Sequence, residues 1–231
     1  MLEYINIDGT NLVSSRIALG TWAIGGWMWG GTDEKESIRT IHAALDQGIN
    51  LIDTAPIYGY GRSEEIVGEA LHQCGRRESV ILATKVGIDW TNGKIERNSA
   101  RQRILGELED SLRRLQTDYI DIYQVHWPDP LVPVEETALT LGELYEQGKI
   151  RAIGISNYSP EEMARFEAVS PPSYDSAALQ SLRTRNRTRC SPIRAEARNH
   201  RAHVRRTLPR IVERCHTYRS SIWQRRHAQN H

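Results

Sequence analysis

Short apolar runs alternate with amphipathic stretches from the N-terminus of the chain to about residue 170. The runs LID, VILATK, YIDIYQV and AIGIS are largely apolar on both faces, as strands buried in a parallel sheet are. The stretch after each run has apolar residues three and four positions apart, which predicts a helix. Repeated strand–helix units of this kind indicate a parallel sheet with right-handed connections.

The expected elements begin at recognisable signals. The segments LEYINI and NLVSSRIALG, with Asp8-Gly9 between them, predict a hairpin that leads into a first sheet strand at 16–19. Most of the expected helix starts carry a side-chain oxygen that can cap the first turn. These starts lie near Asp33, Ser63, Ser99, Val134 and Ser159. Five strand–helix units are then complete by about residue 168.

Polar side chains stand where the predicted strands end. Asp53 and Tyr58 follow LID, Lys85 closes VILATK, His126 closes YIDIYQVH, and Ser156 and Asn157 end AIGIS. Each has an ordinary structural explanation when taken alone, such as a cap, a lysine that reaches solvent or a core histidine. In a (β/α)8 barrel, however, the carboxyl ends of the strands converge on one pocket. We therefore expect an α/β fold of the (β/α)8 TIM-barrel type with its chemistry at these ends.

This set of side chains suits the protonation of a carbonyl oxygen. A phenol has an unperturbed pKa of about 10, and a nearby ammonium lowers it. We expect Lys85 to act on Tyr58 in this way, with Asp53 keeping the ammonium charged and oriented. A neutral His126 can donate an N–H to the substrate oxygen.

These four side chains supply a proton but no electrons, so a carbonyl reduction needs another source of electrons. The sequence has no nucleophile elbow and no HExxH metal pair, so we expect a hydride-carrying cofactor and no metal. No G-x-G-x-x-G opens a helix after a strand, and a nicotinamide cofactor would therefore bind without a Rossmann motif.

The blocks around these residues resemble the aldo-keto reductase superfamily. In order, they are GTWAIGG, INLIDTAPIYGYGRSEEIVGEAL, ILATKVG, LEDSLRRLQTDYIDIYQVHWPD and LYEQGKIRAIGISNY, and the resemblance covers about residues 4–170. It implies the NADPH-dependent reduction of aldehydes or ketones to alcohols by hydride transfer.

The resemblance also implies a role for each matching residue. Tyr58 would be the proton donor, Asp53 and Lys85 the pair that tunes it, and His126 the residue that orients the carbonyl. The residues expected at the cofactor, NADP(H), are Gly20, Thr21, Trp22, Asp53, Ser156 and Asn157. The residues expected at the substrate are Trp22, Tyr58 and His126.

The composition changes after Pro172. Residues 1–172 hold 16 Lys and Arg and 26 Asp and Glu, whereas residues 173–231 hold 14 Arg, no Lys and three acidic residues. Nothing after Pro172 resembles the family's strands six to eight, which hold the adenosine and phosphates of the cofactor. We expect a partial barrel of a hairpin and about five strand–helix units over 1–172, and an irregular, disordered basic tail over 173–231, as in a truncated or frame-shifted copy.

An incomplete barrel has open strand edges, so we expect self-association, weak cofactor binding and impaired activity. The alternative is a non-catalytic barrel fragment whose Arg-rich tail binds polyanions. We expect no specific nucleic-acid partner, because that tail has few aromatic residues for stacking.

The partner that we expect is a small-molecule carbonyl substrate, with no membrane. Three sparse cysteines give no disulfide framework, and no signal peptide or apolar run of about 18 residues is present. These features predict a cytoplasmic protein.

Overall fold

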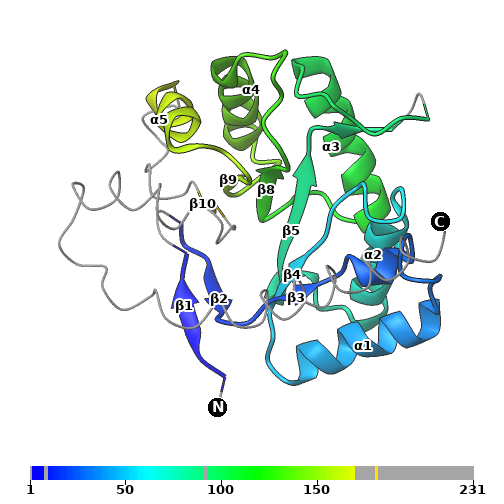
Figure 1. The fold of residues 1–231 in the computed structure, drawn as a ribbon. Coiled ribbons are helices and arrows are strands. Elements are labelled where there is room, and N and C mark those ends of the chain that lie inside the picture. Colours follow the sequence, from blue (N-terminus) through cyan, green and yellow to red (C-terminus); the bar gives the residue numbers. More distant parts are fainter. Residues whose placement is uncertain (1, 8–9, 91–92, 170–179, 182–231) are drawn as a thin grey trace, which may run out of the picture. The chain divides into compact units, whose positions relative to one another are not determined.

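A computed structural model describes residues 2–7, 10–90, 93–169 and 180–181 (Figure 1). The chain divides into Met1–Arg183 and Thr184–His231, and the second part lies outside the described residues. The predicted basic tail therefore lies outside them except at Gln180 and Ser181, and the predicted Asp8–Gly9 turn lies outside them as well. The proposed boundary at residue 172 stays a prediction.

Six strands form one parallel sheet in the order β10-β9-β8-β5-β4-β3. In chain order they are β3 (Leu19–Gly20), β4 (Leu51–Asp53), β5 (Ile81–Val86), β8 (Ile122–Val125), β9 (Ile153–Ile155) and β10 (Gln180–Ser181). The five helices that follow the first five strands are α1 (Glu34–Asp46), α2 (Arg62–Cys74), α3 (Arg101–Leu115), α4 (Val134–Glu146) and α5 (Pro160–Val169). The predicted alternation of five strand–helix units is confirmed, and the described strands form an open arc of a barrel.

Shorter elements complete the described part. Two antiparallel pairs, β1 (Tyr4–Asn6) with β2 (Val13–Ser15) and β6 (Ile88–Asp89) with β7 (Glu96–Arg97), lie outside the main sheet. Two 3₁₀ turns, η1 (Ala23–Gly25) and η2 (Arg77–Ser79), precede α1 and β5. None of the described helices is both long enough and apolar enough to cross a membrane.

The helices stand in a single row, each packed against the next, and cover one face of the sheet (Figure 1). Their apolar stripes meet the outward side chains of the strands in one core. The largest fully buried side chains of this core include Tyr123, Tyr158, Phe166, Ile41 and Ile52. The other face of the sheet is thereby left for the barrel interior.

The hairpin β1–β2 closes the amino-terminal end of that interior. Ile7, which follows β1, packs in a second apolar cluster with Ile81, Ala83, Ile122 and Ala152, each in the first half of a strand or directly before it. The hairpin is fixed there by Asn50, the residue before β4, whose Oδ1 accepts from the Ser15 N–H at 2.6 Å. Water-excluding packing at this end leaves the opposite end of the interior for polar groups.

The first sheet strand begins later than the predicted 16–19. The Arg16 N–H donates to the Glu3 carbonyl at 2.7 Å, so Arg16 continues the hairpin rather than the sheet. At the other edge, β10 adds a strand in a segment whose side-chain pattern predicts none. Its two residues pair with Gly154 and Ile155 of β9, and main-chain pairing of this kind needs no apolar side chains.

Two of the predicted helix caps are confirmed. Asp33 caps α1 and accepts from the Glu36 N–H at 3.0 Å. Ser159 and Glu162 form a reciprocal capping box at α5, with distances of 2.7 and 3.2 Å.

Two other predicted caps, at Ser63 and Ser99, are wrong. Gly61, at φ 97°, precedes the first residue of α2, and Ser63 lies within the helix with its hydroxyl bonded to Thr21. The cap position of α3 is Ala100, and the Ser99 N–H donates instead to Asp129. Tertiary hydrogen bonds thus hold the Ser63 hydroxyl away from a capping role, whereas the Ser99 hydroxyl is buried and has no hydrogen-bond partner among the described residues.

A buried acid on α3 fixes the end of β5. The Glu107 carboxylate accepts from the Gly87 N–H at 3.1 Å, and the Arg103 guanidinium lies 3.3 Å from it. Burial raises the pKa of Glu107 to about 7, although Arg103 and the Gly87 N–H act in the opposite direction. The carboxyl group is therefore more readily protonated in the fold than in the unfolded chain.

This shift predicts a pH-dependent stability. Since the folded chain holds the Glu107 proton up to about pH 7 and the unfolded chain releases it near its ordinary value, the free energy of unfolding should fall as the pH rises through that window, by on the order of 3 kcal/mol. Glu107→Gln, which keeps an acceptor for Gly87, should flatten the slope in denaturant titrations at several pH values. The matched control is Glu109→Gln on the exposed face of α3, and a slope unchanged in Glu107→Gln would contradict the assignment.

Candidate active site

The inner face of each strand changes from apolar to polar along its length. Side chains of a strand alternate between its two faces, so every second residue points inward. Inward positions read Leu51 then Asp53 along β4, Ile81, Ala83 then Lys85 along β5, Ile122, Gln124 then His126 along β8 and directly after it, and Ala152, Gly154 then Ser156 along β9 and its two flanking residues. A polar residue comes last in each case, preceded on β8 by a second polar residue, Gln124, and all the strands are parallel. The polar groups therefore gather at one end of the interior, opposite the hairpin.

Lys85 lies at the centre of this group. Its ammonium is buried and donates to both oxygens of Asp53 and to the Thr54 carbonyl, each at 2.8 Å, and to the Tyr58 hydroxyl at 3.3 Å. Burial acts to lower the pKa of Lys85, but the charges of Asp53 and Tyr58 outweigh it, and the net direction is upward. The structure thus holds a charged ammonium against the phenol.

Tyr58 reaches the site from the loop after β4. Its ring lies 6.0 Å from the His126 ring, edge to face, and 6.2 Å from the Trp22 ring, measured between centroids. Trp29 stacks edge-on against Trp22 at 5.6 Å. Phenol, imidazole and indole rings that follow three different strands thus lie together, and Lys85 contacts the Tyr58 hydroxyl.

Asn157 joins the ends of β8 and β9. Its Nδ2 donates to the His126 carbonyl at 2.7 Å and to the Ser156 hydroxyl at 3.1 Å. Its backbone has φ 68°, a left-handed conformation that asparagine tolerates better than most residues. Its Oδ1 is buried and has no hydrogen-bond partner in the described part of the chain. An unpaired buried acceptor beside a polar cluster fits a ligand that brings an N–H donor.

Gly20, Thr21 and Trp22 differ in what they leave free for a cofactor. A Cβ at Gly20 would meet no atom within 4 Å, so the backbone there faces open space. The Thr21 hydroxyl is buried, donates to the Asp53 carbonyl at 3.0 Å and accepts from Ser63 at 2.8 Å, which ties β3 to β4. Trp22 presents its ring to Tyr58.

The comparison with known proteins decides the family. The family model of the aldo/keto reductase family matches residues 16–208. This chain belongs to the aldo/keto reductase family. The match extends past residue 172, where the predicted barrel segment ends.

Several relatives and solved structures of this family are similar to the chain. It is 65% identical over 170 residues to the aldo-keto reductase YhdN of Bacillus subtilis. The aligned residues make up 74% of this chain and 51% of YhdN. It is 42% identical over 180 residues to the NADH-specific methylglyoxal reductase of Escherichia coli. The aligned residues make up 71% of this chain and 55% of that protein.

Among solved structures, a glycerol dehydrogenase from Gluconobacter oxydans matches with a TM-score of 0.67 and 54% identity, over 73% of this chain and 52% of that one. The predicted fold class, an incomplete (β/α)8 barrel, is confirmed. The chain spans about half the length of the relatives that it matches.

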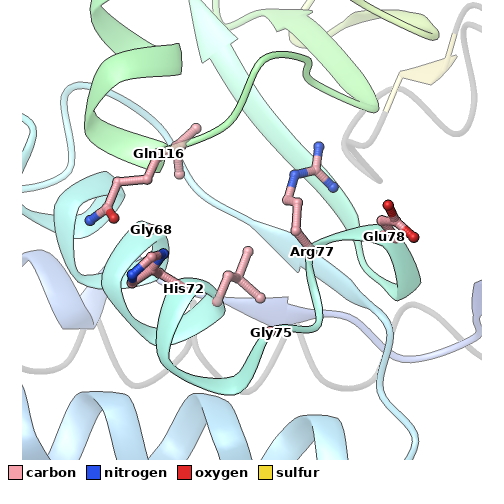
Figure 2. A pocket seen from close by; sticks show the side chains of 8 residues that line it. Gly68, His72, Gly75, Arg77, Glu78 and Gln116 are labelled. Carbon is pink, nitrogen blue, oxygen red and sulfur yellow. The ribbon is translucent and has the colours of Figure 1, made fainter.

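A surface cavity lies away from the cluster of polar residues around Lys85. It measures about 280 Å³ and lies where α2 and α3 end and η2 leads into β5, at the amino-terminal ends of the strands (Figure 2). Arg77 is its cation, and its guanidinium is already bonded to Thr117, the Val80 and Tyr119 carbonyls, and Asp121. The cavity therefore belongs to the stabilising end of the barrel.

The sequence pattern missed three contributors to the site. The Thr54 carbonyl accepts from Lys85, and Gln124 donates to Asp53 at 3.4 Å. Gly25 packs so closely on the Tyr58 backbone that a Cβ there would lie 2.6 Å from the Tyr58 carbonyl carbon. Period-two counting back from His126 would have found Gln124, whereas the other two contacts are made by main-chain atoms of Thr54 and Tyr58, which follow β4, and leave no periodic signal.

The Gly25 contact yields a test of how Tyr58 is positioned. Gly25→Ala must push the Tyr58 backbone aside, because the added carbon would overlap main-chain atoms rather than a flexible side chain. We expect kcat to fall about tenfold or more, and the unfolding midpoint to fall as well because backbone atoms must move. The control is Gly20→Ala, whose Cβ meets open space among the protein atoms, assayed for its unfolding midpoint. Unchanged kcat in Gly25→Ala would contradict the account.

Proposed function

We propose that the chain carries the carbonyl-reducing site of an aldo-keto reductase and reduces aldehydes or ketones to alcohols. The observation that carries this proposal is the buried Lys85 ammonium, hydrogen-bonded to Asp53 on one side and to the Tyr58 hydroxyl on the other. The alternative, polyanion binding by the Arg-rich tail, rests on residues outside the described part of the chain, and no observation favours it.

In the proposed reaction Tyr58 gives its proton to the carbonyl oxygen of the substrate. Lys85 stabilises the phenolate that is left, and Asp53 keeps Lys85 ionised within the barrel interior. His126, whose ring lies edge to face with that of Tyr58, would donate a hydrogen bond to the same oxygen and orient it. Trp22 provides an apolar wall beside the phenol.

A reduced nicotinamide, when bound, supplies the hydride that goes to the carbonyl carbon, so that hydride and proton together convert the carbonyl to an alcohol. Ser156 and Asn157 would hold its carboxamide, because the unpaired Asn157 Oδ1 can accept an amide N–H. Asp53, Gly20, Thr21 and Trp22 would lie near the ring. We propose NADP(H), although the Escherichia coli relative is named NADH-specific, and both cofactors belong in the assay.

The remaining sequence predictions stay predictions. They are a cytoplasmic location, self-association through open barrel edges, and weak cofactor binding and activity because residues after 172 do not resemble the family's late loops.

Tyr58→Phe tests the proposal most simply, because it removes the proton and keeps the ring. With methylglyoxal or an aromatic aldehyde, we expect NADPH oxidation by the wild-type chain and a loss in kcat of about 10²-fold or more in the variant. Tyr60→Phe is the matched control, since this half-exposed phenol lies two residues further on and should leave turnover unchanged. Absence of turnover in the wild type with both NADH and NADPH, or full turnover in Tyr58→Phe, would refute the proposal.

A further inference from the structure

Gln124 lies on β8 beside the Asp53–Lys85 ion pair, and the proposed carbonyl reduction gives it no role. Its side chain is fully buried. On β8 it pairs with Lys85 of β5 on one side and with Gly154 of β9 on the other. Residues that are paired on neighbouring strands point to the same face, so Gln124 and Lys85 share the inner face of the sheet.

The carboxylate fixes the orientation of the Gln124 amide. Nε2 donates to Asp53 Oδ1 at 3.4 Å, a long hydrogen bond. An ionised carboxylate only accepts, so a flipped amide would place two acceptors together. Lys85 donates to the same Oδ1 at 2.8 Å. Two donors from neighbouring strands thus hold this carboxylate from two directions.

The other end of the amide contributes no hydrogen bond to the described part of the chain. Gln124 Oε1 is buried and has no hydrogen-bond partner among the described residues. An unpaired buried acceptor costs about 1–3 kcal/mol, and a methionine of similar volume would avoid that cost. A buried amide whose one side-chain hydrogen bond among the described residues goes to Asp53 points to a role in the site.

Gly154 makes room for Gln124. A Cβ at Gly154 would lie 2.4 Å from Gln124 Cγ and 3.3 Å from its Cβ and Cδ. Gly154 is not among the glycines with positive φ, so backbone conformation does not require glycine here. Space for the glutamine stem is the requirement that the structure shows, and two strands are therefore adapted to place this one amide.

We infer that Gln124 is a positioning residue of the proposed reductase, which holds the Asp53 carboxylate against Lys85 so that the ammonium stays beside the Tyr58 hydroxyl. The inference rests on the proposed function, and Gln124 acts through Asp53.

Two substitutions test it through turnover. Gln124→Met keeps the volume and removes the N–H, and kcat should fall about tenfold without a lower unfolding midpoint. In Gln124→Glu only the protonated carboxyl can donate to Asp53. Its kcat, divided by that of the wild type, should therefore be near one at low pH and fall at least tenfold as the pH rises and the two carboxylates repel. A merely structural role would leave this ratio flat across pH.

A second readout needs no turnover. Acetylation of Lys85 by acetic anhydride, measured by peptide mass spectrometry relative to the half-exposed Lys149, should rise severalfold in Gln124→Met because Asp53 no longer stays on the ammonium. Gly154→Ala, which displaces Gln124 from another strand, should do the same and serves if Gln124→Met fails to fold.

The outcomes separate the two claims. If the wild type shows no turnover but the labelling ratio rises in the two variants, the proposed function is refuted and the role of Gln124 is supported. A labelling ratio unchanged in both variants overturns the inference, whatever the turnover.

Discussion

A lysine ammonium buried in a barrel interior is the constraint on which this structure depends. An isolated charge in that position would be costly, and the usual outcome is that the amine loses its proton. Asp53 prevents this by placing both carboxylate oxygens 2.8 Å from Lys85 Nζ. The ammonium that results also donates to the Thr54 carbonyl at 2.8 Å and lies 3.3 Å from the Tyr58 hydroxyl. The ion pair is therefore weak as a source of stability and strong as a means of placing a charge next to a phenol.

The rest of the fold follows from the need to hold that pair at one end of a parallel sheet. Inward side chains are apolar where strands begin and polar where they end, and the hairpin β1–β2 covers the apolar end. Backbone bonds carry the arrangement across strands, as when the Thr21 N–H donates to the Asp53 carbonyl and the His126 N–H to the Val86 carbonyl. The Asn157 side chain, which follows β9, donates to the His126 carbonyl and so links β9 to the end of β8. Each strand thus sets the height at which its neighbour presents a reactive group.

The sequence sufficed for the features that depend on period and order. Alternating strands and helices, the barrel class, and the polar residue at each strand end could all be read because parallel strands repeat one geometry. Contacts set by tertiary packing could not be read. Ser63 is a residue type that often caps helices, but here it is buried and hydrogen-bonds to Thr21. Gly25 lies in a glycine-rich segment that suggests a flexible loop, but it packs against the Tyr58 backbone. The strand β10 escaped prediction because main-chain pairing alone forms it. The roles given to the site residues remain predictions, since geometry brings groups together without performing the reaction.

The titration of Lys85 tests the central claim most directly. With lysine labelled at Nζ with ¹⁵N, NMR spectra over a pH series would follow this one ammonium in the wild type and in Asp53→Asn. The account predicts a midpoint above the ordinary lysine value in the wild type, because Asp53 outweighs burial, and a midpoint below it in Asp53→Asn, where burial acts without its counter-charge. The same midpoint in both proteins would show that Asp53 does not hold the charge, and the account would be wrong.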